Sequence, residues 1–127
     1  AAVAAALGLP RGRPVVLAER LGLVDGRPVV FGTHHFPAAR FPRIAEALAA
    51  DPSITKALAA GGVPDYRRRT TKVTARMPTP EEAALLGQSR TRPVLATETV
   101  NTDPDGDPVE AGWGCYAAGR VQIVVEA

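Results

Sequence analysis

Two glycine-containing reversals limit most strongly what this chain can fold into, because each stands between segments typical of β-strands. The pair Asp25-Gly26 favours a tight turn, and residues 103–106 form a second turn signal further along the chain. Reversals this short join antiparallel strands, so the sequence predicts a mainly antiparallel sheet. The four strand-like segments that flank these turns are residues 13–23, 28–36, 93–101 and 109–116.

Helical segments are mixed with these strands without the regular strand-helix-strand repeat of a parallel sheet, which predicts an α+β fold with flanking helices. A further strand is expected at residues 66–77. A last one is expected at residues 120–126, where the odd-numbered valine and isoleucine side chains share one face. Helices are expected, from their start and stop signals, at residues 1–7, 41–50, 54–58 and 79–87.

Composition sets the broad class of protein. The 127 residues fit one domain, and 46% hydrophobic with 22% charged residues is typical of a globular chain. No apolar run reaches the roughly 20 residues of a membrane span. The single cysteine, Cys115, excludes a disulfide framework and a cysteine-rich zinc site and favours a reducing, cytoplasmic setting.

Charge and the first residue add two expectations. A net charge of +2 is too small to indicate nucleic-acid binding by itself, but it permits an anionic small molecule as ligand. Because the chain opens on Ala1 with no signal peptide, we expect a piece of a longer protein.

Eight short segments stand in a characteristic order along nearly the whole chain: LVDGRPV (23–29), FPAARFP (36–42), SITKAL (53–58), DYRRRTT (65–71), PVL (93–95), VN (100–101), DGDPVE (105–110) and RVQ (120–122). In this order they resemble the UTRA domain, the effector-binding domain that follows a winged-helix DNA-binding domain in HutC-branch regulators of the GntR family. The runs at 36–42, 53–55 and 120–122 are most similar to the phosphonate-metabolism regulators of the PhnF kind.

The resemblance implies a chorismate-lyase-like fold that works as a ligand sensor. Residues 1–127 would be the UTRA effector-binding domain, and the winged-helix domain and the first strand of the family would lie outside this sequence. The implied function is to bind a small anionic metabolite, such as a phosphonate or a phosphorylated compound, and to modulate DNA binding by a bacterial repressor. The family also implies a homodimer, no cofactor and no DNA binding by this domain alone.

The sequence leaves two other functions open. The fold is shared with a lyase that releases pyruvate from chorismate, so a chorismate-lyase-like enzyme is the alternative. No nucleophile and base pair, metal-ligand cluster or acid pair is recognisable in the sequence, so we expect no catalytic residues and no metal site. A third possibility treats the basic run at residues 67–69 as a nucleic-acid contact.

Arg20 is the first candidate ligand contact. In relatives that bind phosphorylated sugars, two arginines spaced two apart hold the phosphate, and matching puts Arg20 on the first position and Gly22 on the second. The planar guanidinium makes two charge-assisted hydrogen bonds to an oxyanion. Because half of this clamp is missing, a different or smaller anion is expected. The alternative is a surface arginine paired with Glu19 or another neighbour.

The start of the helix at residues 54–58 is the second candidate. Ser53 and Thr55 match effector contacts of the family, and their hydroxyls stand beside unpaired backbone N–H groups that suit an oxyanion. The alternative is that Ser53 or Asp51 only caps the helix, and the two roles can coexist. Asp51 as the cap would weaken anion binding.

Two further cationic candidates lie on strands. His34 and His35 point to opposite faces of an extended segment, so only one of them readily faces a cleft. His34 at the cleft would donate to an anion and bind it better at lower pH; otherwise one histidine is exposed and the other packed. Arg68 best matches the family's Tyr-x-Arg pattern, and Thr71 after it is expected to line the same cleft, although a short basic run is usually a solvated strand end.

Glu110 and Tyr116 complete the predicted site. They match positions that in relatives contact hydroxyl or amine groups of the effector, and Glu110 would suit the ammonium of an amine-bearing phosphonate. Alternatively, Glu110 faces solvent and Tyr116 lies in the core. Trp113 and Cys115 share one side of a strand and are expected to pack, since Cys115 has no activating partner.

Overall fold

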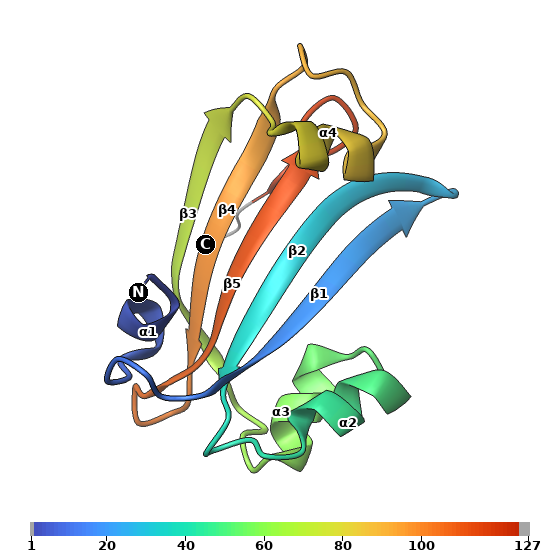
Figure 1. Ribbon diagram of the computed structural model, residues 1–127. Helices are drawn as coiled ribbons and strands as arrows, with labels where there is room; N and C mark the ends of the chain where they lie inside the picture. The colour runs from blue at the N-terminus through green and yellow to red at the C-terminus, as the bar shows by residue number, and fades with distance from the viewer. Residues whose placement is uncertain (1, 125–127) are drawn as a thin grey trace.

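One antiparallel sheet organises the protein (Figure 1). The computed structural model describes residues 2–124, and within them five strands pair in the order β1-β2-β5-β4-β3. The strands are β1 (Val15–Val24), β2 (Arg27–Pro37), β3 (Arg67–Arg76), β4 (Val94–Thr102) and β5 (Pro108–Ala117). The helices are α1 (Ala2–Leu7), α2 (Ile44–Ala50), α3 (Ile54–Ala60) and α4 (Pro80–Leu86). Because every strand pair is antiparallel, the predicted α+β fold is confirmed.

Both predicted reversals are confirmed, and each has a local cause. Asp25 has φ 50° and Gly26 has φ 76°, and two successive positive φ values are what a type I′ hairpin turn requires. Between β4 and β5, Asp103 Oδ1 accepts hydrogen bonds from the backbone N–H groups of Asp105 and Asp107, at 2.9 and 3.0 Å. The short side chain of Asp103 thus closes the turn on itself.

The two faces of the sheet pack against different helices. Phe36 on β2 belongs to a core cluster with side chains of α2 and α3. Phe31 lies an odd number of positions away on the same strand, so it points to the other side and packs beside Leu86 of α4 and Cys115 of β5. The face that carries Phe36 is the cavity face below, and the face that carries Phe31 is the opposite face. In Figure 1, α2 and α3 lie together at one end of the sheet and α4 at the other.

The predicted helix at residues 41–50 begins three residues late, at Ile44. Residues 38–43 are mostly turns, in which the N–H of Phe41 donates to the backbone oxygen of Pro37. The ring of Phe41 is buried edge-on against Phe36, with centroids 6.5 Å apart. Packing of this side chain into the core replaces the helical turn that the sequence pattern indicates.

The other helix signals act as predicted. Ser53 is the N-cap of α3, which runs to Ala60, two residues beyond the predicted end. Thr79 and Glu82 form a reciprocal capping box at the start of α4, and Gly87 ends that helix at φ 60°. None of the helices in residues 2–124 is long and apolar enough to cross a membrane.

The predicted strand at residues 120–126 is wrong for the part that the structure describes, which ends at Val124; Val125 and Glu126 lie outside the described residues. The chain turns after β5 and continues from Val121 without strand pairing. The guanidinium of Arg120 donates to the backbone oxygens of Pro28, Leu86 and Gly87. Since β5 already has β2 and β4 on its two sides, it offers this segment no free edge.

Candidate functional site

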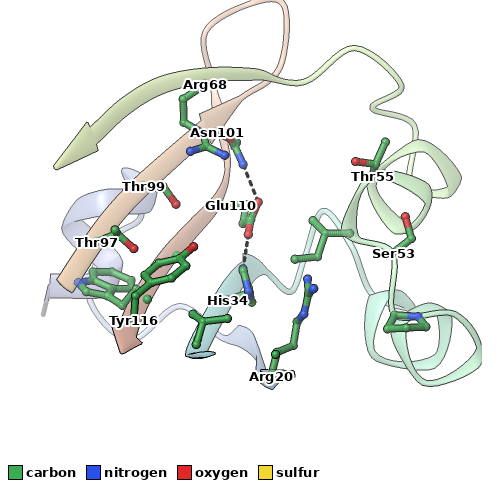
Figure 2. Close-up of a pocket in the computed structure, with 18 of the residues that line it drawn as sticks. Arg20, His34, Ser53, Thr55, Arg68, Thr97, Thr99, Asn101, Glu110 and Tyr116 are labelled. Atoms are coloured by element: carbon green, nitrogen blue, oxygen red, sulfur yellow. Dashed lines mark hydrogen bonds and ion pairs between the residues drawn. The ribbon is translucent and has the colours of Figure 1, made fainter. Parts of the chain in front are cut away.

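A cavity of about 510 Å³ lies between the cavity face of the sheet and the start of α3 (Figure 2). Strands β1, β2, β4 and β5, together with the beginning of β3, contribute its lining. All seven residues that the sequence predicts as ligand contacts lie on it: Arg20, His34, Ser53, Thr55, Arg68, Glu110 and Tyr116. The structure therefore brings together residues from both ends of the chain.

Glycines make room for this cavity. Four line it: Gly22, Gly32, Gly112 and Gly114. A Cβ atom on Gly114 would lie 2.6 Å from Thr97 Oγ1, and one on Gly112 would lie 2.9 Å from Thr99 Oγ1. A side chain at either position would clash with a threonine hydroxyl of the neighbouring strand. The glycines therefore leave this part of the sheet, the floor of the cavity, without side chains of its own.

A chain of hydrogen bonds crosses the cavity. Glu110 Oε2 lies 2.6 Å from His34 Nδ1, and Glu110 Oε1 accepts from Asn101 Nδ2 at 2.7 Å (Figure 2). Asn101 Oδ1 in turn accepts from Arg68 Nε at 2.8 Å. Glu110 and Asn101 are only 3% and 4% exposed, so this polar chain is held at the base of the cavity. Four side chains from four strands are thereby fixed relative to one another.

Positive charge prevails in the cavity. Arg20 enters from β1 and Arg68 from β3, and Glu110 is the only carboxylate among the described lining residues. Within residues 2–124, Arg20 makes no ion pair, and the strand's alternation puts Glu19 on the opposite face. The alternative pairing of Arg20 with Glu19 is therefore wrong. An unpaired guanidinium at a cavity wall is available to an oxyanion.

Ser53 lies at a position that suits both of its predicted roles, helix cap and ligand contact. Its hydroxyl accepts from the backbone N–H of Lys56 at 3.2 Å, which makes it the helix cap, and it also lines the cavity. Asp51 accepts from the backbone N–H of Ser53 at 3.0 Å and pairs with Lys56, and the first of these bonds is the main reason why the pKa of Asp51 is lowered. Asp51 is absent from the described cavity lining, and its charge is paired.

The two histidines lie on opposite faces, as predicted. His34 points into the cavity toward Glu110. His35 Nδ1 lies 3.3 Å from the backbone oxygen of Ala111, and its ring meets the Trp113 ring edge-on at 5.2 Å. His35 is thus partly packed, and of the two histidines only His34 is among the described residues that line the cavity.

Arg68 alone of the basic run reaches the cavity. All ten residues of β3 are exposed, and neither Arg67 nor Arg69 is among the lining residues. Thr71 accepts from Arg68 Nη1 at 3.2 Å but does not itself line the cavity. Arg68 is held by its hydrogen bonds to Asn101 and Thr71. Arg67 and Arg69 instead fit the alternative for the basic run, a solvated strand end.

Cys115 and Tyr116 are adjacent on β5, so their side chains point to opposite faces of the sheet. Tyr116 lines the cavity, while Cys115 is buried on the opposite face. Burial raises the pKa of the Cys115 thiol to about 11, so the thiol stays protonated and unreactive at neutral pH. This confirms the expectation that Cys115 is a packing residue.

Sequence reasoning missed several lining residues. Asn101 joins Arg68 to Glu110, and Thr97 and Thr99 lie beside it on the same strand face. The spacing of two between these three polar residues on a strand predicts that they share a face. Gly112 and Gly114 repeat the same spacing, which would have indicated an open patch on the sheet.

Comparison with known proteins gives consistent matches. The UTRA domain family model matches residues 1–122. An HTH-type transcriptional regulator of Rhizobium meliloti (strain 1021) is 41% identical over 124 residues, which are 98% of this chain and 51% of the relative. The chain therefore spans about half the length of that curated relative.

Two solved structures share the fold. PhnF from Mycobacterium smegmatis aligns with a TM-score of 0.88 at 28% identity, over 98% of this chain and 56% of that one. The effector domain of the same regulator aligns with a TM-score of 0.87 at 28% identity, over 98% of this chain and 77% of that one.

Proposed function

This chain belongs to the UTRA domain family of GntR-type transcriptional regulators, and we propose that it senses a small anionic metabolite whose binding changes how the whole regulator holds DNA. The observation that carries the proposal is the cavity whose described lining holds the guanidinium groups of Arg20 and Arg68 but only one carboxylate, Glu110, which already accepts from His34 and Asn101. Charge of one sign in a partly enclosed hollow attracts the opposite charge more strongly than the same groups do on open surface.

The geometry favours a compact oxyanion such as a phosphonate or a phosphorylated compound. Gly22 stands where sugar-phosphate-binding relatives have a second arginine, so one guanidinium is left for the anion at that wall. The hydroxyls of Ser53, Thr97 and Thr99 add neutral donors around it. Similarity to PhnF supports a phosphonate as the first class to test.

In the whole regulator, residues 1–127 would form the effector domain of a cytoplasmic, HutC-branch repressor, with a winged-helix domain outside this sequence on the operator. A homodimer would present two such heads to a two-fold operator. A coupling free energy of about 1–3 kcal/mol between effector and operator would change operator affinity about 5- to 150-fold. That is enough for derepression.

Calorimetry with inorganic phosphate, ethylphosphonate and a sugar phosphate tests the proposal directly. Arg20→Ala and Arg68→Ala should each weaken binding of the best ligand by about 1.5–3 kcal/mol, because each removes a charged hydrogen bond. Arg69→Ala is the matched control, since it removes an exposed arginine of β3 that does not line the cavity. Unchanged affinity in both cavity variants would reject the proposal.

The enzyme alternative has its own readout. Incubation with chorismate should release no pyruvate if the domain is a sensor, whereas turnover would assign it the chemistry of the lyase that shares its fold. DNA binding is tested in the same series: salt-dependent binding of DNA by residues 1–127 alone would favour the nucleic-acid reading of the basic run on β3.

A further inference from the structure

Both side-chain oxygens of Glu110 already accept a hydrogen bond, and the group is buried. His34 Nδ1 lies 2.6 Å from Oε2, and Asn101 Nδ2 donates to Oε1 at 2.7 Å. Only 3% of the residue is exposed. A carboxylate can only accept hydrogen bonds, so both of these contacts are donations to it, and with so little of its surface exposed a ligand reaches Glu110 only if these buried neighbours move.

These contacts also fix which atoms face the cavity. Because His34 gives its Nδ1 proton to Glu110, its Nε2 is left for the cavity, where it lies above the floor: a Cβ on Gly32 would stand 3.5 Å from it. Because Asn101 donates its amide to Glu110, its oxygen faces Arg68 Nε and holds that guanidinium at 2.8 Å. The carboxylate thus orients one imidazole directly and one guanidinium through Asn101.

We propose that Glu110 and Asn101 are positioning residues, and that the cavity consequently selects oxyanions that carry no ammonium group. This inference rests on the proposed anion-sensing function and narrows its ligand class. It departs from the role expected from the family resemblance, in which Glu110 meets the effector's amine. The one carboxylate in the described lining already accepts two hydrogen bonds, so an ammonium group in this cavity would lack a free anionic partner. It would also share the cavity with Arg20 and Arg68, whose positive charges repel it.

A matched pair of probes tests the selection: ethylphosphonate and 2-aminoethylphosphonate differ only in the amine. Calorimetry on the unaltered chain near neutral pH should give affinity at least about tenfold higher for ethylphosphonate, because an unpaired cation is costly to desolvate. Equal affinity, or preference for the amine-bearing compound, overturns the inference and leaves anion sensing intact. If neither compound nor inorganic phosphate binds, the proposed function fails, and this inference fails with it.

Variants of His34 separate positioning from a merely structural role. His34→Ala frees Glu110 Oε2, so the preference for ethylphosphonate over 2-aminoethylphosphonate should fall about tenfold or reverse. In the double variant His34→Ala/Glu110→Gln the carboxylate is gone, so the gain in affinity for 2-aminoethylphosphonate should disappear. His34→Asn keeps a donor near the carboxylate and should keep the preference. Equal losses for both probes in His34→Ala would contradict the assignment. The comparison on the unaltered chain decides the inference even if a variant does not fold.

Discussion

A glutamate on each side of the sheet accepts short hydrogen bonds from neighbouring side chains, and the two glutamates have different surroundings. On the cavity face, Glu110 is buried in a floor kept open by glycines, and its partners His34 and Asn101 themselves border the hollow. On the opposite face, Glu82 of α4 accepts two bonds from Arg76 of β3, at 2.7 and 2.9 Å.

The surroundings explain the difference. On the opposite face, Phe31, Cys115 and Leu86 pack under α4, and the Glu82–Arg76 pair joins that helix to the edge strand. Glu82 also accepts from the backbone N–H of Thr79 in the capping box, and the pair borders a second hollow of about 570 Å³. On the cavity face Gly112 and Gly114 add no side chain of their own, so His34 and Asn101 border the cavity together with their partner Glu110. The glutamate on the opposite face therefore connects a helix to the edge strand, whereas Glu110 connects side chains of neighbouring strands at the base of the cavity.

Phe36→Ala should break the cavity face most severely. The ring of Phe36 is fully buried in the cluster that seats α2 and α3 beside the cavity, and its removal should cost about 3–5 kcal/mol of unfolding free energy. Chemical denaturation measures the change. Leu17→Ala, on an exposed side chain of β1, is the control and should shift stability by less than about 0.5 kcal/mol. Similar losses in both variants would contradict the assigned core.

Gly114→Val should fill part of the cavity floor. The new side chain would crowd Thr97 and Tyr116, so we expect a loss of about 1–3 kcal/mol in stability and a drop of about tenfold or more in phosphonate affinity. Gly119→Ala, where a Cβ meets only a flexible arginine at 3.6 Å, should change neither. Full affinity in Gly114→Val would show that ligand does not use the floor.

The two helix caps sharpen the comparison, because one lies at the cavity and the other near the opposite face. Ser53→Ala and Thr79→Ala each remove a hydroxyl that accepts a backbone N–H, and each should destabilise the protein by about 1 kcal/mol. Only Ser53→Ala should also weaken phosphonate binding in calorimetry. Unaltered affinity in Ser53→Ala would leave Ser53 as a cap and nothing more.

Glu82→Gln gives the smallest expected effect. The hydrogen bonds from Arg76 are the main cause that lowers the pKa of Glu82 from 4.5 to about 2. A pKa lowered in the folded state contributes stability that is present above about pH 4.5 and is lost as pH falls toward 2. In the variant, the free energy of unfolding should fall by roughly 0.5–1 kcal/mol less over that pH range than in the unaltered chain. The expected difference is small because the side chain of Arg76 is 41% exposed and solvent screens the pair.

Thermal unfolding from pH 5 to pH 2 measures this difference, with Glu81→Gln as the matched control on the same helical turn. Glu81 makes no ion pair within the residues that the structure describes. An acid profile identical in Glu82→Gln and the unaltered chain would contradict the role of the Arg76 pair.

Features closed by residues near one another in the sequence were predictable, and features that depend on distant residues were not. The Asp25-Gly26 turn and the Thr79 capping box were predictable because each is closed by residues within a few positions. The late start of α2 was not, because it depends on where the ring of Phe41 is buried. The predicted strand after Arg120 failed for a similar reason: an alternating pattern pairs only where a neighbouring strand has a free edge.

The sequence by itself determined where the chain reverses, which side chains share a strand face, and that His34 and His35 cannot both reach one cleft. These properties belong to the backbone over a few residues. Only the tertiary structure decided that His34 meets Glu110, 76 residues away, because that contact requires β5 to pair beside β2. It also decided that Glu110 is already bonded on both oxygens, since the partners of a buried group depend on which strands become neighbours.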